Sequence, residues 1–294
     1  EGLLNYDSLD IEFAINNQNE YFLFQVRPLV AHAHNQIVSN KDIQKELECA
    51  KIFAGNLLAP HPYLYGYSTI LGTMPDWNPA EIIGSTPHPL ALSLYQYLIT
   101  DTIWGKSRRT MGYHDTFPEP LVVSLVGRPY VDTRASFNSF LPKGLPANLS
   151  EKLVNHYLDR LKSHPHLHDK IEFEIALTCY SFDFDFHAQR LKNDNFDLDE
   201  ISLIKSLLFK LTDNAVKEKN ISIEDELNHC SGLSEKRLKI LDGLDGTPDN
   251  LIRSIRYLLD CCISGTLAFS NLARLGFIGS SFLKSFKRLG KLTN

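Results

Sequence analysis

The chain has 294 residues, a formal net charge of −5 at pH 7 and 43% hydrophobic residues, which fits a globular protein with a sizeable core. No apolar run approaches the ~20 residues that a bilayer-spanning helix needs, and the acidic start does not resemble a signal peptide. The five cysteines are odd in number and show no CxxC spacing. We therefore expect neither a disulfide framework nor a zinc site, and we expect a cytoplasmic protein.

The charge is unevenly distributed. No acidic residue follows Asp260, so the last 34 residues carry +5 and the first 260 carry −10. Cations near the C-terminal end of a helix interact favourably with its dipole, which explains this pattern without a ligand. Nucleic-acid binding would need basic residues interleaved with exposed aromatic residues over a wider surface. We expect neither a nucleic-acid partner nor a membrane.

The first predicted elements are a β-hairpin and a helix. Residues 9–15 and 21–27 have the pattern of two strands around the polar turn NNQNE. Residues 41–57 are predicted to be helical, because Ser39 and Asp42 have capping-box spacing and apolar residues follow at helical intervals.

The next part of the chain is predicted to mix a long loop with a helix and short strands. Residues 59–89 are rich in proline, glycine and aromatic residues, which indicates an ordered loop or a set of turns. An apolar helix is expected from Pro89 to about Trp104. The stretch LVVSLVGRPYVDTRASF favours two β segments bent at Gly127 and Arg128.

The second half of the chain is predicted to be mainly helical. Asn148 and Glu151 have capping-box spacing at the start of an amphipathic helix, whose apolar face comprises Leu149, Leu153, Val154, Tyr157, Leu158 and Leu161. The stretch KIEFEIALTCY favours a strand by its alternation, but its i+4 repeats leave a helix open. Asp197 and Thr247 mark two helix starts. Beyond residue 190 we expect helices at about 198–212, 222–228, 233–242, 248–263 and 267–290.

Two glycines lie inside the last predicted helix. Gly276 and Gly279 each cost about 1 kcal/mol relative to alanine, which suggests close packing against a neighbour. Taken together, the pattern predicts an α+β fold: an N-terminal β-hairpin followed by a mostly helical domain with a small β-sheet.

Four polar residues of the predicted hairpin belong together. Residues two apart on a strand face the same way, so Asp10 and Glu12 share a face, as do Gln25 and Arg27. A turn centred between residues 18 and 19 places Glu12 opposite Gln25 and Asp10 opposite Arg27. The other face, which we expect to point into a core, carries Ile11, Phe13, Phe24 and Val26.

These four residues allow two interpretations. One is a surface hairpin with a cross-strand ion pair, worth at most ~1 kcal/mol. The other is a Mg²⁺–nucleotide site, because carboxylate oxygens hold a hard cation and a guanidinium binds phosphate oxygens.

The hairpin resembles part of a known family. The pattern LDIEFAI…YFLFQVRPL resembles the end of the ATP-grasp nucleotide-binding domain in the phosphoenolpyruvate synthase and pyruvate phosphate dikinase family, where a DIE strand precedes a QxRP strand. The resemblance implies that Glu12 ligates the metal of Mg-ATP and that Gln25 and Arg27 line its phosphate site, with Asp10 as a weaker member.

Four later segments resemble the middle region of the same family: MPDWNPAEIIG, GRPYVDTRASFNSF, LHDKIEFEIALTCY and GTLAFSNLARLGFIGSSFLKS. The resemblance implies that residues 1–35 end an ATP-grasp domain and that residues 36–294 form a middle domain that links domains or binds the phosphoryl acceptor. Relatives often belong to surface-polysaccharide gene sets, and one subgroup phosphorylates the side-chain amide of glutamine.

The family also needs parts that this sequence lacks. They are the rest of the ATP-grasp domain, with its Gly-rich loop, and a swivelling domain that carries a phosphohistidine. No Gly-rich loop precedes residue 9 and no GG pair occurs. We therefore expect a fragment of an ATP-dependent phosphotransferase, with no catalytic residue of its own and inactive alone.

A second site is expected at Asp132, Arg134 and Asn138. A charged pair inside an apolar β segment must find partners or a ligand, because burying either charge alone is costly. The alternatives are an internal network and a site for the phosphoryl acceptor. Two further polar clusters are weaker: a proline and a helix start explain most of Trp77, Asn78 and Glu81, and Asp183, Asp185 and His187 are expected on a half-exposed strand or bend.

The alternating His164, His166 and His168 suggest a metal site, but Pro165 and a solvated link between elements argue against it. The expected cofactors are thus ATP and Mg²⁺, with a small-molecule phosphoryl acceptor and the remaining domains as partners. The acceptor, whether pyruvate, an amide or a polysaccharide precursor, stays open. The rival hypotheses are a non-catalytic helical scaffold and, far behind, a metal-dependent hydrolase.

Overall fold

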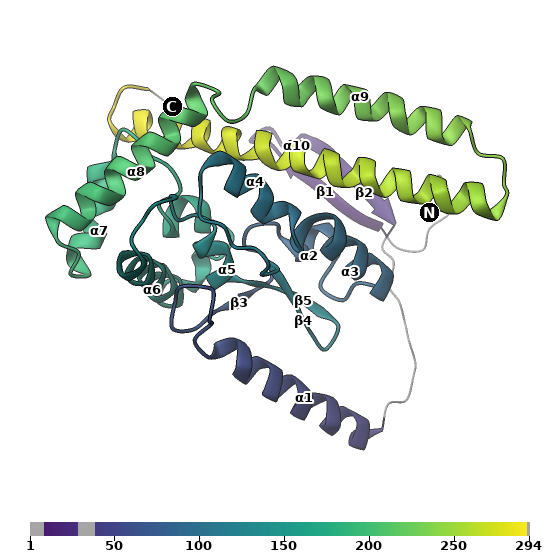
Figure 1. The fold of residues 1–294 in the computed structure, drawn as a ribbon, viewed down its shortest axis with the longest axis horizontal. Coiled ribbons are helices and arrows are strands. Elements are labelled where there is room, and N and C mark those ends of the chain that lie inside the picture. Colours follow the sequence, from purple (N-terminus) through teal and green to yellow (C-terminus); the bar gives the residue numbers. More distant parts are fainter. Residues whose placement is uncertain (1–8, 29–38, 293–294) are drawn as a thin grey trace. The chain divides into compact units, whose positions relative to one another are not determined.

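The computed structural model describes residues 9–28 and 39–292 and confirms the α+β fold class (Figure 1). The chain divides into two compact units, Glu1–Glu46 and Leu47–Asn294. The division falls inside helix α1 (Asn40–Leu58), which begins as predicted with Ser39 at its N-terminus. The predicted domain boundary between residues 35 and 36 lies outside the described residues.

The first unit contains the hairpin of β1 (Leu9–Ile15) and β2 (Tyr21–Pro28). Its register confirms that the two polar pairs face each other, since Asp10 pairs with Arg27 and Glu12 with Gln25. A bulge follows Glu12 and shifts the later pairs by one residue. The predicted turn centre is therefore wrong by half a residue.

The bulge also changes the apolar face of the hairpin. Phe13 pairs with Leu23 and not with Phe24, so Leu23 takes the predicted place of Phe24 on this face. Ile11 and Phe13 are 47% and 56% exposed. The expectation that this face points into a core is not met within the described part of the hairpin.

The second unit begins with the end of α1 and an ordered loop. This loop contains β3 (Leu71–Gly72) and α2 (Pro79–Ile82). A three-stranded antiparallel sheet has the order β3-β5-β4, formed with β4 (Val122–Leu125) and β5 (Arg128–Asp132). The bend predicted at Gly127 and Arg128 lies one residue earlier, at Val126 and Gly127, whose φ angles are 52° and 74°.

Two predicted elements change type. The predicted helix from Pro89 is split into α3 (Pro89–Tyr95), a π-helical turn (Gln96–Thr100) and α4 (Ile103–Met111). The β segment after Gly127 ends at Asp132, where α5 (Thr133–Asn138) begins. The cause is the Asp132 side chain, which accepts a hydrogen bond from the Ala135 amide and so caps the helix.

Helix α6 (Ala147–Ser163) buries all six predicted apolar residues. The capping box predicted at Asn148 and Glu151 is wrong, because the Glu151 carboxylate accepts a hydrogen bond from the Gly66 amide. The strand predicted for KIEFEIALTCY is also wrong. Residues Ile171–Ile175 form a π-helical turn that buries both of its terminal isoleucines, which is the i+4 pattern left open by the sequence.

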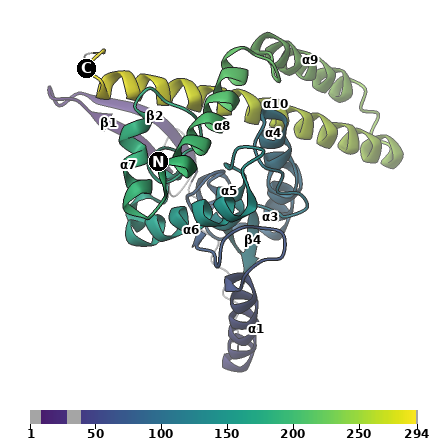
Figure 2. The same ribbon diagram turned by 60° about the vertical axis from the view of Figure 1, so that its left-hand side comes forward.

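The remaining helices are α7 (Phe184–Asn193), α8 (Leu198–Val216), α9 (Ile223–Asp242) and α10 (Pro248–Arg288). The predicted capping residues Asp197 and Thr247 start α8 and α10. The four short helices predicted after residue 222 merge into α9 and α10, which lie side by side (Figures 1 and 2).

Helix α10 has 41 residues. Apart from the helix's own backbone, no described atom would lie within 4 Å of a Cβ placed on Gly276 or Gly279, so the close packing predicted there is absent from the described structure. Length and composition alone would let α10 cross a membrane, which the sequence had not suggested. This is weak evidence for a span, because core helices of soluble proteins pass the same test, and α10 buries Asn271 and Arg274.

The described part of this unit has three clusters of buried apolar residues, and α10 contributes to the third. One cluster of buried residues lies around α5, α6 and α8, and a second lies around Trp104 and the sheet. A third includes Met111 of α4, Leu211 of α8 and Ile278 of α10. The segments between these clusters carry the buried charges described next.

Candidate functional site

Four buried charged residues meet where α4 and α10 pack together. Asp76 precedes α2, Arg108 lies on α4, Glu172 on the π-helical turn and Arg274 on α10. Their side chains are 2%, 7%, 11% and 3% exposed, respectively. We call these four residues the charged cluster. Buried charges of both signs must satisfy one another, because an unpaired buried charge is costly.

Asp76 and Arg108 form the closed half of the charged cluster. Arg108 donates two parallel hydrogen bonds to the Asp76 carboxylate, of 2.8 and 2.5 Å. The Ser136 hydroxyl donates a third, of 2.6 Å, and Arg108 also donates to Ser139. This bidentate pair is the strong form of an ion pair. It has little capacity left for a ligand.

Glu172 and Arg274 form the open half. The Glu172 carboxylate lies 3.6 Å from Arg274 and 3.5 Å from Arg108, with no hydrogen bond from its side chain to any described residue. Arg274 donates one hydrogen bond, of 3.1 Å, to Thr178. Its Nε and Nη1 atoms are buried and have no hydrogen-bond partner in the described structure. A guanidinium has five N–H donors, so most of this capacity is unused.

The surroundings shift the pKa values of the open half. Burial raises the pKa of Glu172; Arg274 and Arg108 oppose this rise, and Asp76 adds to it. Burial alone would lower the pKa of Arg274, but nearby Tyr113 and Glu172 outweigh burial and raise it. The site therefore keeps its arginine charged, while burial makes the ionised form of Glu172 less favourable than it is in water.

A cavity of about 270 Å³ borders the charged cluster. Its remaining walls are mainly aromatic and aliphatic, with Trp77 and Phe269 in ring contact at 5.9 Å between centroids. The Tyr95 hydroxyl donates to the Trp77 carbonyl and fixes that segment. An apolar pocket with a few convergent polar groups is typical of small-molecule sites. The residues that line it outside the charged cluster are Trp77, Asn78, Glu81, Ile82, Phe269, Ser270, Ala273 and Phe277.

The four segments that carry the family resemblance beyond the hairpin all reach this place. MPDWNPAEIIG supplies Asp76, GRPYVDTRASFNSF supplies Ser136, LHDKIEFEIALTCY supplies Glu172 and GTLAFSNLARLGFIGSSFLKS supplies Arg274. Segments far apart in the sequence thus build one site.

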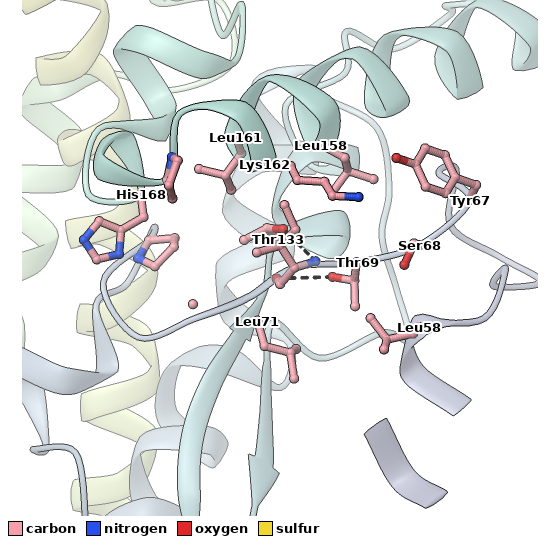
Figure 3. Close-up of a pocket in the computed structure, with 14 residues that line it drawn as sticks. Leu58, Tyr67, Ser68, Thr69, Leu71, Thr133, Leu158, Leu161, Lys162 and His168 are labelled. Atoms are coloured by element: carbon pink, nitrogen blue, oxygen red, sulfur yellow. Dashed lines mark hydrogen bonds between the residues drawn. The ribbon is translucent and has the colours of Figure 1, made fainter. Parts of the chain in front are cut away.

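A second cavity, of about 520 Å³, is larger but chemically simpler (Figure 3). Leu158 and Leu161 of α6 line it together with Leu71 of β3, and Lys162 and His168 add polar groups. Lys162 is exposed and His168 is half-buried. Among the described residues that line it there is no buried charge, so we take the charged cluster as the candidate site.

The structure gives Asp132 and Arg134 a structural role. Asp132 caps α5 and accepts a 2.5 Å hydrogen bond from Thr69. Arg134 is 1% exposed and donates to the carbonyls of Ala59 and Leu57, at 2.7 and 2.9 Å. Its charge thus lies at the C-terminal end of α1, where a helix dipole favours a cation.

Asn138 is equally engaged. Its side chain accepts from the Tyr65 amide and donates to the carbonyls of Tyr65 and Arg134. The acceptor site expected at Asp132, Arg134 and Asn138 is therefore replaced by internal ties. Because the sequence assigned Arg134 to a β segment, these backbone partners were not predicted.

The hairpin residues lie as the resemblance requires, with Asp10 opposite Arg27 and Glu12 opposite Gln25. Arg27 donates from Nε to Asp10 at 2.7 Å, and this hydrogen bond raises the pKa of Arg27. The terminal nitrogens of Arg27 have no partner among the described residues and could bind phosphate. Glu12, beside Gln25, offers oxygen ligands for Mg²⁺. No group of three or more His, Cys, Asp or Glu suited to a metal occurs in the described chain.

The three histidines, for which the sequence argued against a metal site, lie in and beside the 3₁₀ turn Pro165–Leu167. His164 ends α6 and His166 lies in a 3₁₀ turn, with 6.1 Å between their ring centroids. The strand or bend predicted for Asp183–His187 is helix α7. Asp183 and His187, one turn apart, both contact Arg288 of α10 and tie the two helices together.

Sequence reasoning missed Arg108, Glu172 and Arg274. A signal existed for two of them, because Glu172 and Arg274 are charges inside apolar segments, IEFEIALTCY and LAFSNLARLGFI. The same argument had been applied only to the pair of Asp132 and Arg134.

No protein-family model, curated protein or solved structure matches the chain. The resemblance to phosphoenolpyruvate synthase therefore stays a prediction.

Proposed function

We propose that the chain is part of an ATP-dependent phosphotransferase resembling phosphoenolpyruvate synthase, and that the cavity beside the charged cluster binds the phosphoryl acceptor. The observation that carries the proposal is Arg274, a buried guanidinium with unused donors in the wall of a small-molecule cavity. Donors of this kind bind a carboxylate or amide oxygen of an acceptor and orient it.

The hairpin has a separate role in this proposal. Glu12 would hold Mg²⁺, and Gln25 and Arg27 would bind phosphate oxygens at one wall of the ATP site. Bound Mg-ATP would supply the phosphoryl group and neutralise its developing charge. The shared face of Asp10, Glu12, Gln25 and Arg27 supports this assignment. Other domains would complete the site and carry the phosphoryl group, in a cytoplasmic enzyme.

The acceptor is a small molecule with at least one oxygen acceptor for Arg274. An amide such as that of glutamine, a keto acid such as pyruvate, and a polysaccharide precursor all meet this condition. The aromatic walls at Trp77 and Phe269 favour a planar or apolar body.

The test is acceptor-dependent ATP consumption by the full-length protein. Arg274→Met should raise KM for the acceptor at least tenfold and leave KM for ATP unchanged. Arg109→Met is the matched control, because Arg109 is the neighbour of Arg108 on α4 but pairs with Asp115 at the surface. Unchanged acceptor kinetics in Arg274→Met would refute the assignment of this cavity.

A second candidate function is a non-catalytic interaction module. The observation that favours it is the exposure of apolar residues on α10 beside α9, where Ile252 and Ile255 are 62% and 57% exposed. Exposed apolar residues that cluster on a helix can mark a binding surface. In that case Ile252→Lys would weaken partner binding, whereas Arg274→Met would leave it unchanged.

A further inference from the structure

We propose that the cavity beside the charged cluster binds its ligand through an anionic group, and that Glu172 takes up one proton for each anion bound. The inference rests on the proposed function in one respect, which is that it concerns the same cavity. It assigns a ligand class and a coupling to protons, both of which can be measured without turnover.

The first step is the binding group. Arg274 lines the cavity, is 3% exposed and leaves Nε and Nη1 without hydrogen bonds. The Phe277 and Phe140 rings lie 5.1 and 5.5 Å from its guanidinium carbon and confine it without using its N–H donors. Unsatisfied buried donors on a cation are costly. Both nitrogens are shielded in this structure, so a carboxylate in the cavity would satisfy them by drawing the guanidinium toward it.

The second step is the charge balance. Arg108 and Arg274 carry two positive charges, which Asp76 and Glu172 balance when both are ionised. A bound anion would then leave one negative charge in excess within a buried site, which is unfavourable. Protonation of one carboxylate removes the excess.

The third step identifies the carboxylate. Asp76 receives two hydrogen bonds from Arg108 and one from Ser136. The Glu172 carboxylate receives none from the described residues and lies 3.5 Å or more from either guanidinium. Burial already raises the pKa of Glu172, and an anion on Arg274 would raise it further. Glu172 therefore takes the proton.

The other titratable groups around Glu172 do not compete. Burial raises the pKa of Tyr113 to about 12, so the phenol is neutral. Burial also raises the pKa of the Cys179 thiol. A small cavity of about 50 Å³ on the other side of Glu172 is lined by charged groups that include Glu174, Asp183, His187, Lys284 and Arg288. Asp183 and His187 in this set are engaged with Arg288, and Lys284 lies 3.5 Å from the Phe173 ring centroid.

The cavity suggests the rest of the ligand. Trp77, Phe269 and Phe277 form its apolar walls, and its volume of about 270 Å³ suits a small molecule. A ligand with a carboxylate group and a planar apolar body would match both the Arg274 donors and the apolar walls. Benzoate is a suitable probe, and benzamide is its uncharged counterpart of nearly equal shape.

The experiment is isothermal titration calorimetry of the 294-residue chain with benzoate at pH 7.5, in two buffers that differ in ionisation enthalpy. The difference between the observed enthalpies gives the number of protons taken up, which should approach one per benzoate. Affinity should fall by up to about tenfold per pH unit between pH 7 and 8.5. Benzamide should bind without proton uptake. Fluorescence of Trp77, which lines the cavity, reports occupancy independently.

Two variants make the test specific. Glu172→Gln removes the titrating group but keeps the shape, so benzoate should bind at least as tightly, without proton uptake and independently of pH. Arg274→Met should abolish benzoate binding, and Arg274→Lys, which keeps the charge, should restore part of it. Far-UV circular dichroism and the melting temperature show whether each variant is folded.

Several outcomes would overturn the inference: no benzoate binding by the wild-type chain, binding without proton uptake, or uptake that persists in Glu172→Gln. These outcomes are separable from failure of the proposed function. If the protein bound benzoate with proton uptake but had no phosphotransferase activity, the anion site would stand and only the proposed enzymatic activity would be refuted. If turnover depended on Arg274 but used a neutral acceptor, the proposed function would stand and the anion site would be refuted.

Discussion

Glu172 and Arg274 lie 3.6 Å apart in a buried site, yet no hydrogen bond joins them. Arg108 and Asp76, the other two residues of the charged cluster, form two hydrogen bonds of 2.8 and 2.5 Å. The two pairs therefore have different roles. The tight pair, Asp76 and Arg108, holds α4 to the segment before α2. The loose pair, Glu172 and Arg274, leaves hydrogen-bond donors of Arg274 unused beside the cavity.

The tight pair should contribute strongly to stability. Arg108→Met leaves the Asp76 carboxylate buried without its main partner, so the free energy of unfolding should fall by about 3–5 kcal/mol. Urea denaturation followed by circular dichroism measures the change. Arg109→Met, which breaks the exposed pair with Asp115, should cost at most about 1 kcal/mol. Equal losses in the two variants would contradict the role assigned to Arg108.

Arg134 should act as a structural tie. Arg134→Met removes the donors for the carbonyls of Leu57 and Ala59 and should lower the free energy of unfolding by about 2–4 kcal/mol. Benzoate affinity and acceptor KM should stay unchanged. Lys162→Met, at an exposed residue of α6, is the control and should change stability little. A raised acceptor KM with unchanged stability would restore the acceptor site first expected here.

The hairpin makes a prediction about ATP. In the full-length protein, Glu12→Ala or Arg27→Ala should lower kcat/KM for ATP by roughly ten- to a hundredfold, because each removes a charge-assisted contact worth about 1.5–3 kcal/mol. Glu20→Gln, in the turn of the same hairpin, should have little effect, since Glu20 bonds only within the turn. Initial rates of ATP consumption provide the measurement. Normal kinetics in both hairpin variants would show that the hairpin has no nucleotide role.

His156 should make stability depend on pH. It is buried, contacts Asp194 at 2.5 Å, and burial together with Arg190 lowers its pKa despite that contact. The folded pKa lies below the unfolded value, about 6.5, so protons bind more readily to the unfolded chain. This contribution to stability is complete above pH 6.5 and is lost as the pH falls from 6.5 through the folded pKa.

Unfolding by urea at pH 7.5, 6.5 and 5.5 tests this dependence. His156→Asn keeps a donor near Asp194 but cannot titrate, so the loss of stability between pH 6.5 and 5.5 should be smaller than in the wild type. His166→Asn, at an exposed position, should retain the wild-type dependence. Identical pH profiles for wild type and His156→Asn would exclude His156 as the source.

Local patterns predicted much of the fold. The pairing of Glu12 with Gln25, the buried face of α6 and the capping of α8 follow from residues close together in the sequence. The errors arose where a distant partner decided the local structure. The Glu151 carboxylate accepts a hydrogen bond from the Gly66 amide in the loop before the sheet, and it therefore does not cap α6.

The candidate site was less predictable for the same reason. Arg108 and Arg274 are brought together by the packing of α10 against α4, and no local spacing encodes that contact. Glu172 was placed on a strand, where its side chain would have had no defined direction toward either arginine. Trp77 and Glu81 were noticed in the sequence but were explained by local helix initiation.

The length of α10 has a structural consequence. An unbroken helix of 41 residues extends about 60 Å, and it packs against α9 in its first half and carries Arg274 in its second. The segment that packs against α9 and the residue that borders the cavity therefore belong to one continuous element, with no loop between them.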